Sequence, residues 1–330
     1  MDVAVKVALA VRDGRILVDF TGSSDQIAGF KNSSLANTSS AVFMAIMSFF
    51  NGRAPQNQGA MRQIEIIAPE GSVVNARPPA PMTMNTVHPT SEIGHAVWKA
   101  LAQAVPSEAL AGWGKTSHCI SSGVGENGRT FVMYHWHGSS GAGAVDGRDG
   151  IPSAGQLCTL GGMSLPNVEN YEQVYPIRIH HYEMREDSAG AGKYRGGTGL
   201  TYSASTFVPA QYSFRGEGTR KPSAYGIVGG RAGEQGRLDL TFLSDDSAFD
   251  VPQYGVHKLA PAKVSIRSPG GGGYGNPLER EPSRVLRDLR DGLISRETAT
   301  NVYGLILAKT GWAVDEDATR RQRQELENTA

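Results

Sequence analysis

The chain has 330 residues, 32 basic and 32 acidic side chains, a formal net charge of zero and a hydrophobic fraction of 39%. This length allows a sizeable core in one large domain or two smaller ones. The balanced charge argues against a dedicated binder of nucleic acid or acidic membranes, and no apolar run is long enough to span a bilayer.

The first part of the sequence alternates between short strands and helices. Its strands follow a two-residue period and its helices carry apolar faces next to capping residues. The predicted elements, in chain order, are a strand over 3–11, its return over 15–20 after the Asp13-Gly14 turn, a helix over 34–50, a strand over 64–68, a helix over 92–105 capped by Ser91, a strand over 130–135 and a polar, glycine-dense loop over 138–155.

From Tyr175 onward the sequence favours strands separated by glycine turns, beginning with residues 176–183 and continuing to Arg267. The period then becomes helical, which predicts a helical hairpin broken at Gly292, with Ser295 capping its second helix. The charged tail over 315–330 is predicted to fray. We therefore expect an α+β fold with a mixed part (1–170), a β-rich part with glycine turns (171–276) and a C-terminal helical hairpin with its tail (277–330).

The run Pro269-Gly270-Gly271-Gly272-Gly273-Tyr274-Gly275-Asn276-Pro277 is unusual. Four consecutive glycines fit neither a helix nor a good strand, and they commonly mark flexible linkers. Here a β-rich segment precedes the run and a helix follows it directly. We interpret it as a tight, ordered turn in which the backbone approaches other backbone or a ligand.

Histidines offer the first candidate site. His135 and His137 lie on one face of a predicted strand, and His118, Cys119, Asp146 and Asp149 complete a set that could ligate a transition metal. The alternative is a hydrogen-bonded lining of the glycine-rich loop, and it is favoured because no short motif supplies three ligands at standard spacing. Whether a metal binds stays open.

Other motifs give structural predictions. Cys119 is expected to be a buried, inert thiol, and with no secretory signal the two cysteines favour a cytoplasmic, reducing compartment. The glycine-dense stretch over 190–199 lacks the ending of a phosphate-binding loop, although Lys193 and Arg195 could meet an anion or an acidic surface. The asparagines of the first third are expected to organise loops; they are Asn32, Asn37, Asn57, Asn75 and Asn85.

Several segments together resemble the hydantoinase B/5-oxoprolinase family, and they keep the family's order along the chain. They are residues 18–24, 37–42, 69–72 with Asn75-Ala76, 189–197, 270–277, and 290–295 with Tyr303-Gly304. The family includes N-methylhydantoinase, 5-oxoprolinase, caprolactamase and the acetone and acetophenone carboxylases. This resemblance also implies a cytoplasmic protein that assembles with a different subunit into a hetero-oligomer.

The resemblance implies one part of a two-part, ATP-dependent machine. A hydantoinase A-type partner would bind ATP and magnesium and phosphorylate the substrate oxygen, and the B-type subunit would take the activated species to hydrolysis of a small cyclic amide such as a hydantoin, 5-oxoproline or a lactam. A carboxylase component acting on a ketone and bicarbonate is an alternative. A non-catalytic interaction module is another.

The family's metal-site motifs, an Asn-Asp-Pro stretch, a Thr-His-x-x-Asp stretch and a His-x-x-Asp stretch, do not occur in this sequence. No metal ligand is therefore assigned, although a divalent metal is compatible with the family. The sequence is expected to be the C-terminal portion of a B-type subunit, to need the N-terminal half, to be inactive alone, and to be poorly soluble or obligately assembled.

We predict a pocket lined by polar residues at strand ends. His135, Glu92 and His88 are the predicted catalytic residues, of which His135 or Glu92 could move a proton. Arg148 could steady a phosphate or carboxylate. The predicted substrate-binding residues are Ser91, His118, His137, Asp146 and Arg148.

Overall fold

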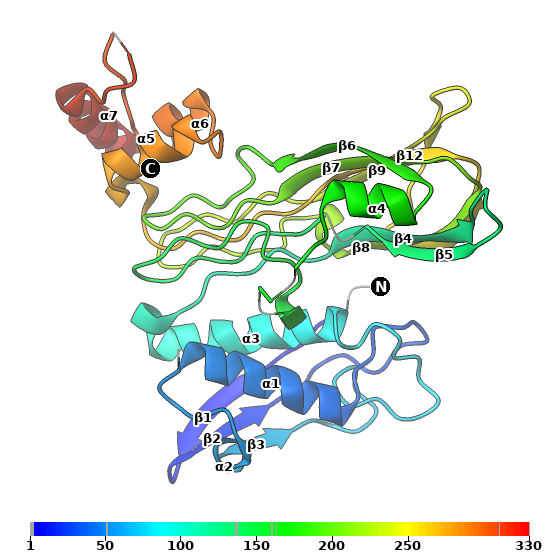
Figure 1. The fold of residues 1–330 in the computed structure, drawn as a ribbon. Coiled ribbons are helices and arrows are strands. Elements are labelled where there is room, and N and C mark those ends of the chain that lie inside the picture. Colours follow the sequence, from blue (N-terminus) through cyan, green and yellow to red (C-terminus); the bar gives the residue numbers. More distant parts are fainter. Residues whose placement is uncertain are drawn as a thin grey trace. The chain divides into compact units, whose positions relative to one another are not determined.

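The computed structural model describes residues 3–50, 52–135, 138–159, 161–162, 164–309 and 311–329. The chain forms two compact units, Met1–Leu110 and Ala111–Ala330. Helices and three β-sheets make up these units, which confirms the predicted α+β class (Figure 1). The boundary predicted near residue 170 falls inside the second unit. No helix among the described residues is long and apolar enough to cross a membrane.

The first unit is a small sheet with two longer helices. Its elements are β1 (Ala8–Arg12), β2 (Arg15–Asp19), α1 (Leu35–Phe49), α2 (Gln58–Met61), β3 (Ile64–Ile67), α3 (His88–Ala104) and the short 3-10 helix η1 (Pro106–Glu108). β1 pairs antiparallel with β2, and β2 pairs parallel with β3. Asp13 and Gly14 join the first two strands with φ values of 48° and 74°, as the predicted hairpin turn requires.

The core of the first unit lies between α1, α3 and the sheet (Figure 1). Val42 and Ile46 of α1 and Val97 of α3 are fully buried. Trp98 Nε1 donates to the Ala45 carbonyl at 3.0 Å, so the largest core side chain also satisfies its polar atom. Ser34 caps α1 by accepting from the amide of Asn37.

Helix α3 begins earlier than predicted. It starts at His88, with Pro89 in its first turn, and not at Glu92. Proline at this position needs no hydrogen-bond partner and has the φ of a helix, so it starts the helix without a side-chain cap. Ser91 therefore lies inside the helix, where its hydroxyl donates to the Val87 carbonyl at 2.8 Å, and its predicted capping role is wrong.

The second unit contains two antiparallel sheets followed by helices. The five-stranded sheet has the order β10-β9-β12-β7-β6 and the four-stranded sheet has the order β11-β8-β4-β5. Their strands are β4 (Ser117–Val124), β5 (Thr130–Tyr134), β6 (Ile177–Met184), β7 (Leu200–Thr206), β8 (Ala210–Gly216), β9 (Arg237–Phe242), β10 (Ala248–Phe249), β11 (Tyr254–Leu259) and β12 (Ala262–Arg267). The β-rich region thus begins at β4, a strand that the sequence analysis did not predict.

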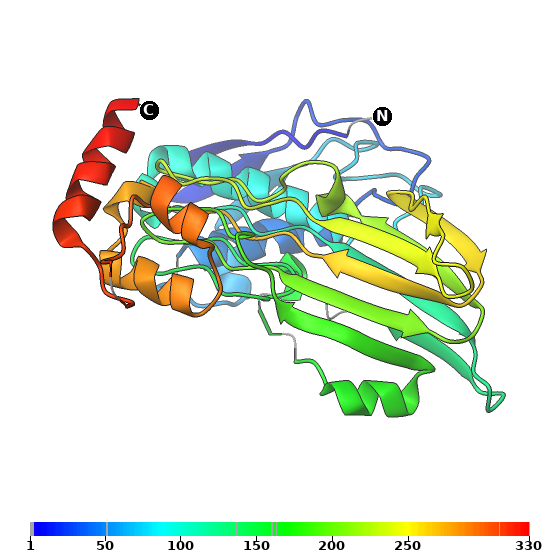
Figure 2. The same ribbon diagram turned by 90° about the horizontal axis from the view of Figure 1, so that it is seen from above.

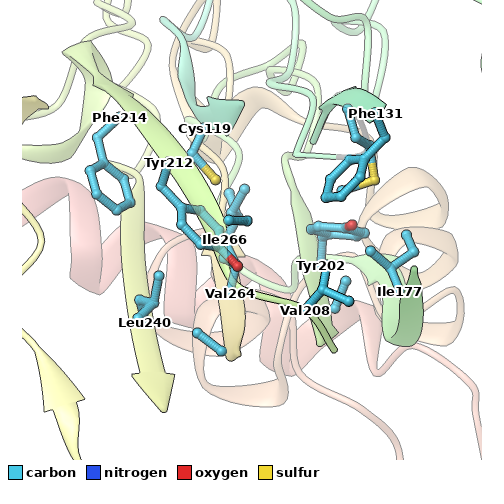
Figure 3. Close-up of a cluster of buried hydrophobic side chains, with 14 residues drawn as sticks. Cys119, Phe131, Ile177, Tyr202, Val208, Tyr212, Phe214, Leu240, Val264 and Ile266 are labelled. Atoms are coloured by element: carbon cyan, nitrogen blue, oxygen red, sulfur yellow. The ribbon is translucent and has the colours of Figure 1, made fainter. Parts of the chain in front are cut away.

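The two sheets of the second unit face each other across one apolar core. Figure 3 shows Cys119 of β4 and Tyr212 and Phe214 of β8 on one side, opposite Val264 and Ile266 of β12. Tyr212 and Phe214 stack with their ring planes 9° apart. Cys119 is fully buried here, which confirms the prediction of a buried thiol, and burial raises its pKa far above the usual value.

Long extended segments continue beyond the sheets and run side by side before the chain reaches its terminal helices (Figures 1 and 2). The glycine run lies among them. The amides of Gly271, Gly272 and Gly273 donate to Gly197, Gly112 and Arg231, which belong to three different segments. A Cβ on Gly271 would lie 1.8 Å from the Ala142 carbonyl oxygen, so no larger residue fits. The predicted close backbone approach is confirmed, but residues 269–273 form neither a turn nor a strand.

The remaining described helices are short and lie mostly at the C-terminal end. They are the 3-10 helices η2 (Leu157–Thr159), η3 (Glu217–Thr219) and η4 (Pro277–Glu279), and the α-helices α4 (Val168–Val174), α5 (Pro282–Arg290), α6 (Arg296–Asn301) and α7 (Glu316–Thr329). Ser295 caps α6 by accepting from the amide of Thr298, as predicted. The tail does not fray, because α7 is a helix whose Arg323 Nε donates to the Tyr303 carbonyl at 3.0 Å.

Candidate functional site

A network of buried amides and hydroxyls joins the starts of α1 and α3 in the first unit. Asn37 Nδ2 donates to the Asn85 carbonyl and to Ser33 Oγ, both at 2.9 Å. Thr90 Oγ1 donates to Asn37 Oδ1 at 3.2 Å. Asn32 accepts from the amide of Ile27 and donates to the carbonyls of Gly29 and Pro81, each at 2.9 Å. These contacts confirm the prediction that the asparagines organise loops.

His88, Ser91 and Glu92 lie next to this network on the first turns of α3. Their spacing of three and four residues puts them on one face of the helix. His88 is 1% exposed and its ring centroid lies 6.2 Å from that of Phe30, whereas Glu92 is half-buried. The structure thus brings together the three predicted site residues of the first unit, and Glu92 is the one of the three that is not fully buried.

His135 lies inside the second unit, directly after β5. It is fully buried, and its ring bonds Ser121 Oγ through Nε2 and the Tyr202 hydroxyl through Nδ1, both at 3.1 Å. Burial raises the pKa of Tyr202 well above its usual value, so the phenol stays protonated beside the imidazole. This geometry links three strands and holds the ring in one orientation.

His118 points away from His135. Because side chains alternate along a strand, His118 lies on the face of β4 opposite Cys119 and Ser121. It lines a small cavity between the start of β4 and the two ends of the glycine-dense loop, with Ser139, Ser140 and Gln156. Ser140 Oγ donates to the carbonyls of Gly114 and Gly155 and so joins the two ends of the loop. The structure therefore does not place the two histidines in one shared site.

Asp146 and Arg148 lie on an exposed turn of the same loop, closed by reciprocal backbone hydrogen bonds between Val145 and Arg148. Both side chains face solvent within the second unit. His137 lies outside the described residues. The substrate-binding role predicted for these three residues stays a prediction.

Asp149 follows that turn and enters a network of ion pairs that the sequence analysis did not predict. Its carboxylate accepts from Arg280 Nη1 and Nη2 at 2.8 and 2.9 Å and from Arg284 Nη2 at 2.9 Å. Arg280, which is 1% exposed, also donates to Asp288 of α5 at 2.7 Å. Arg195 pairs with Asp288 as well, so its acidic partner is a buried residue of this chain and not the surface of another protein.

Opposite charges decide the protonation of this network. Burial alone would raise the pKa of Asp149, but the hydrogen bond and charge of Arg280, with the charges of Arg195 and Arg284, lower it below the usual value. Burial would likewise lower the pKa of Arg280, and Asp149 and Asp288 raise it. Asp149 and Arg280 therefore both stay charged at neutral pH, and the pair of Asp149 with Arg284 ties the glycine-dense loop to α5.

Among the described residues, neither a cluster of metal-ligating side chains nor, over 190–199, a phosphate-binding loop is found. The described residues contain no group of three or more His, Cys, Asp or Glu side chains that could hold a metal ion, and Asp149 is already engaged by arginines. In the stretch over 190–199, a Cβ on Gly196 would lie 2.0 Å from the Gly271 carbonyl oxygen. These glycines pack against protein backbone, which leaves no cradle for a phosphate.

Comparison with known proteins gives one consistent result. Residues 1–277 match the family model described as hydantoinase B/oxoprolinase. The chain is 32% identical over 332 residues to the beta subunit of the caprolactamase of Pseudomonas jessenii, and 30% identical over 333 residues to a putative D-/L-hydantoinase B subunit of a Pseudomonas species. Each alignment covers 98% of this chain.

Comparison with solved structures agrees with the sequence comparison. The crystal structure of the ATP-dependent caprolactamase from Pseudomonas jessenii superposes with a TM-score of 0.83 and 31% identity, over 96% of this chain and 56% of the other. The chain spans 56% and 55% of the lengths of the two curated relatives.

Proposed function

The chain belongs to the hydantoinase B/oxoprolinase family, and from that premise we propose that it forms part of the B-type subunit of an ATP-dependent enzyme that hydrolyses cyclic amides. The similarity to a caprolactamase subunit over 98% of the chain carries this proposal, because it includes both units and the C-terminal helices. The substrate class is a small ring with an amide bond: a lactam, a hydantoin or 5-oxoproline.

In the proposed mechanism, the partner subunit binds ATP and this chain binds the cyclic amide. Amide resonance protects a lactam carbonyl from water, and ATP held by a hydantoinase A-type partner would supply the phosphoryl group that makes its oxygen a leaving group. This chain has no room for a phosphate in its glycine-dense stretch. We therefore propose that it binds and orients the ring, together with the partner and with the B-type sequence that the match leaves uncovered.

Within this scheme, polar groups at the ends of strands and helices are the proposed contacts with the substrate. Arg148, exposed on its turn, is suited to a phosphate or carboxylate because its guanidinium can donate two parallel hydrogen bonds. Glu92, half-buried at the start of α3, is the proposed proton carrier. A catalytic role for His88 and substrate-binding roles for Ser91, His118, His137 and Asp146 are proposed for each residue separately.

The test is an assay of the reconstituted complex. The chain, a hydantoinase A-type partner and the uncovered B-type portion are combined with caprolactam, hydantoin or 5-oxoproline. We expect ring opening that depends on ATP and releases phosphate. Labelled bicarbonate appearing in a ketone-derived product would instead identify a carboxylase, and association with no turnover of any substrate would identify an interaction module.

His135 needs its own experiment, because both of its ring nitrogens are already bonded within the fold. His135→Phe removes both hydrogen bonds while keeping a ring. Loss of turnover with an unchanged free energy of unfolding would support the predicted catalytic role. Full turnover per folded molecule, with a free energy of unfolding lowered by about 1–3 kcal/mol, would assign the imidazole to the fold alone.

A further inference from the structure

The turn over 145–148 carries Arg148, the side chain proposed to hold a phosphate or carboxylate. Val145 and Arg148 close the turn through two backbone hydrogen bonds of 3.1 and 3.2 Å. At its tip Gly147 has a φ of +80°, and a Cβ there would have no atom within 4 Å. Because residues 146–148 are exposed, the contacts that fix the direction of Arg148 must act at the base of the turn.

Asp149 is the first residue after the turn, and its carboxylate is held from two sides. Its Oδ1 accepts from the Arg195 amide and from Arg280 Nη1, both at 2.8 Å. Its Oδ2 accepts from Nη2 of Arg280 and from Nη2 of Arg284, both at 2.9 Å. The end of the turn is therefore anchored both to the glycine-dense stretch over 190–199 and to the arginines around the start of α5.

Arg284 differs from the other two arginines of this network in its surroundings. Its side chain is 33% exposed, whereas those of Arg280 and Arg195 are 1% and 5% exposed. Its guanidinium lies over the Tyr194 ring, 5.5 Å from the ring centre, and this contact restrains a long side chain at the surface. Removing Arg284 therefore leaves the buried ion pairs of Arg280 in place and takes away only the outer donor to Asp149.

We propose that Arg284 is a positioning residue for the substrate contact of Arg148. It holds Oδ2 of Asp149, Asp149 fixes the end of the turn, and the turn directs Arg148 toward the anionic group of the substrate. A backbone that is fixed before binding does not have to be ordered when the ligand arrives, which raises the affinity obtained from the same contact. This role rests on the proposed function, in which Arg148 contacts the substrate.

Residue-resolved hydrogen exchange tests whether Arg284 holds the turn, and it requires no enzyme activity. In the full chain carrying Arg284→Met, we expect the amides of Val145 and Arg148 to exchange about fivefold faster than in the wild type, as loss of a partly exposed ion pair implies. The amide of Ala204 in the core strand β7 should not change. Unchanged exchange at the turn overturns the proposal. Equal acceleration at Ala204 overturns it as well, because Arg284 would then stabilise the whole unit.

Arg287→Met is the matched control. It makes the same change of side chain on the same helix, at an exposed residue outside the ion pairs of Asp149. It should alter neither exchange at the turn nor turnover of the complex. Faster exchange at the turn in this variant too would assign the effect to the charge of α5 and overturn the specific role of Arg284.

A double-mutant cycle in the reconstituted complex tests whether Arg284 acts through Arg148. We expect Arg284→Met to lower kcat/KM for ring opening about fivefold in the wild-type background and less than about twofold in the Arg148→Met background. Equal losses in both backgrounds overturn the proposal, and so does an Arg148→Met variant with full kcat/KM. A wild-type complex that opens no ring refutes the proposed function, whereas the exchange comparison still decides whether Arg284 holds the turn.

Discussion

At the scale of single residues, the structure distinguishes groups that hold the fold from groups that face outward. His135 bonds two neighbours in the core, whereas Arg148 and Asp146 lie on an exposed turn. Asp149, one residue beyond that turn, is held by two arginines. Residues close together in sequence therefore have different physical roles, because a turn directs successive side chains to different surroundings.

The ion pairs of Asp149 predict a dependence of stability on pH. Its folded-state pKa is lowered, so its contribution to the free energy of unfolding is complete above the usual carboxyl pKa of about 4 and is lost as the pH falls through the folded value. We expect wild-type stability to fall between about pH 5 and pH 2 more steeply than that of Asp149→Asn. Urea unfolding across this pH range measures the free energy of unfolding of both proteins. Parallel pH curves for the two proteins would contradict the expected difference in slope.

The arginine at the centre of the network predicts a larger effect. Arg280→Met leaves Asp149 and Asp288 close together with one counter-charge removed from the interior. Breaking a buried ion pair in this way costs about 3–5 kcal/mol of unfolding free energy, measured by denaturant titration. Arg237→Met is the control, because its pair with Asp239 is largely exposed and should cost less than about 1 kcal/mol.

At the scale of elements, the glycine-rich segments are as much a part of the architecture as the sheets. Residues 269–273 have no regular strand pairing, yet the amides of their glycines bond to several different segments. Such packing is possible only where carbonyl oxygens occupy the space of a missing Cβ. The C-terminal helices attach to these segments through Arg195, Arg280 and Asp288.

Close packing of the glycine run predicts intolerance to the smallest side chain. Gly271→Ala would place a carbon 1.8 Å from the Ala142 carbonyl oxygen, so backbone must move. We expect a loss of about 3 kcal/mol or more in the free energy of unfolding, or no soluble folded protein. Gly147→Ala is the control. Its φ is +80° with no atom within 4 Å, so it should cost only about 1–2 kcal/mol.

The cap of α6 predicts a modest and local effect. Ser295→Ala removes the acceptor for the amide of Thr298, which should lower the free energy of unfolding by about 1 kcal/mol. Ser295→Asp keeps an acceptor at the same position and should restore most of the stability. Equal losses in both variants would mean that the hydroxyl contributes by packing rather than by capping.

At the scale of the whole molecule, equal numbers of acidic and basic side chains leave the protein without net repulsion at neutral pH. The isoelectric point of the sequence is about 7.1. Short sheets with unpaired edges, such as β1 and β3 at the two sides of the first sheet, add surfaces that can pair with other chains.

These two features predict the strongest self-association near pH 7. The isolated chain should scatter most light there and least above about pH 9, where its net charge is negative. Adding the proposed partner portions should suppress scattering at pH 7. A monodisperse monomer at pH 7 without any partner would contradict the expectation of obligate assembly.

The sequence by itself determined the local elements and the family. Period and capping placed α1, the β1–β2 hairpin, β3 and the start of α6, because these depend on neighbours within a few residues. The run of four glycines also indicated close backbone approach, since only glycine permits it. Motifs in a fixed order identified the family, which the comparisons confirmed.

Only the tertiary structure decided which distant residues meet. The pairing of Asp149 with Arg280 spans 131 residues, and the cavity lined by His118 and Gln156 depends on how a loop returns to β4. No local pattern marks either contact. His118 and His135 are likewise apart because His118 lies on the face of β4 opposite Ser121, which is the partner of His135. Such contacts arise because the core fixes strand order and register, and those are set by packing over the whole unit.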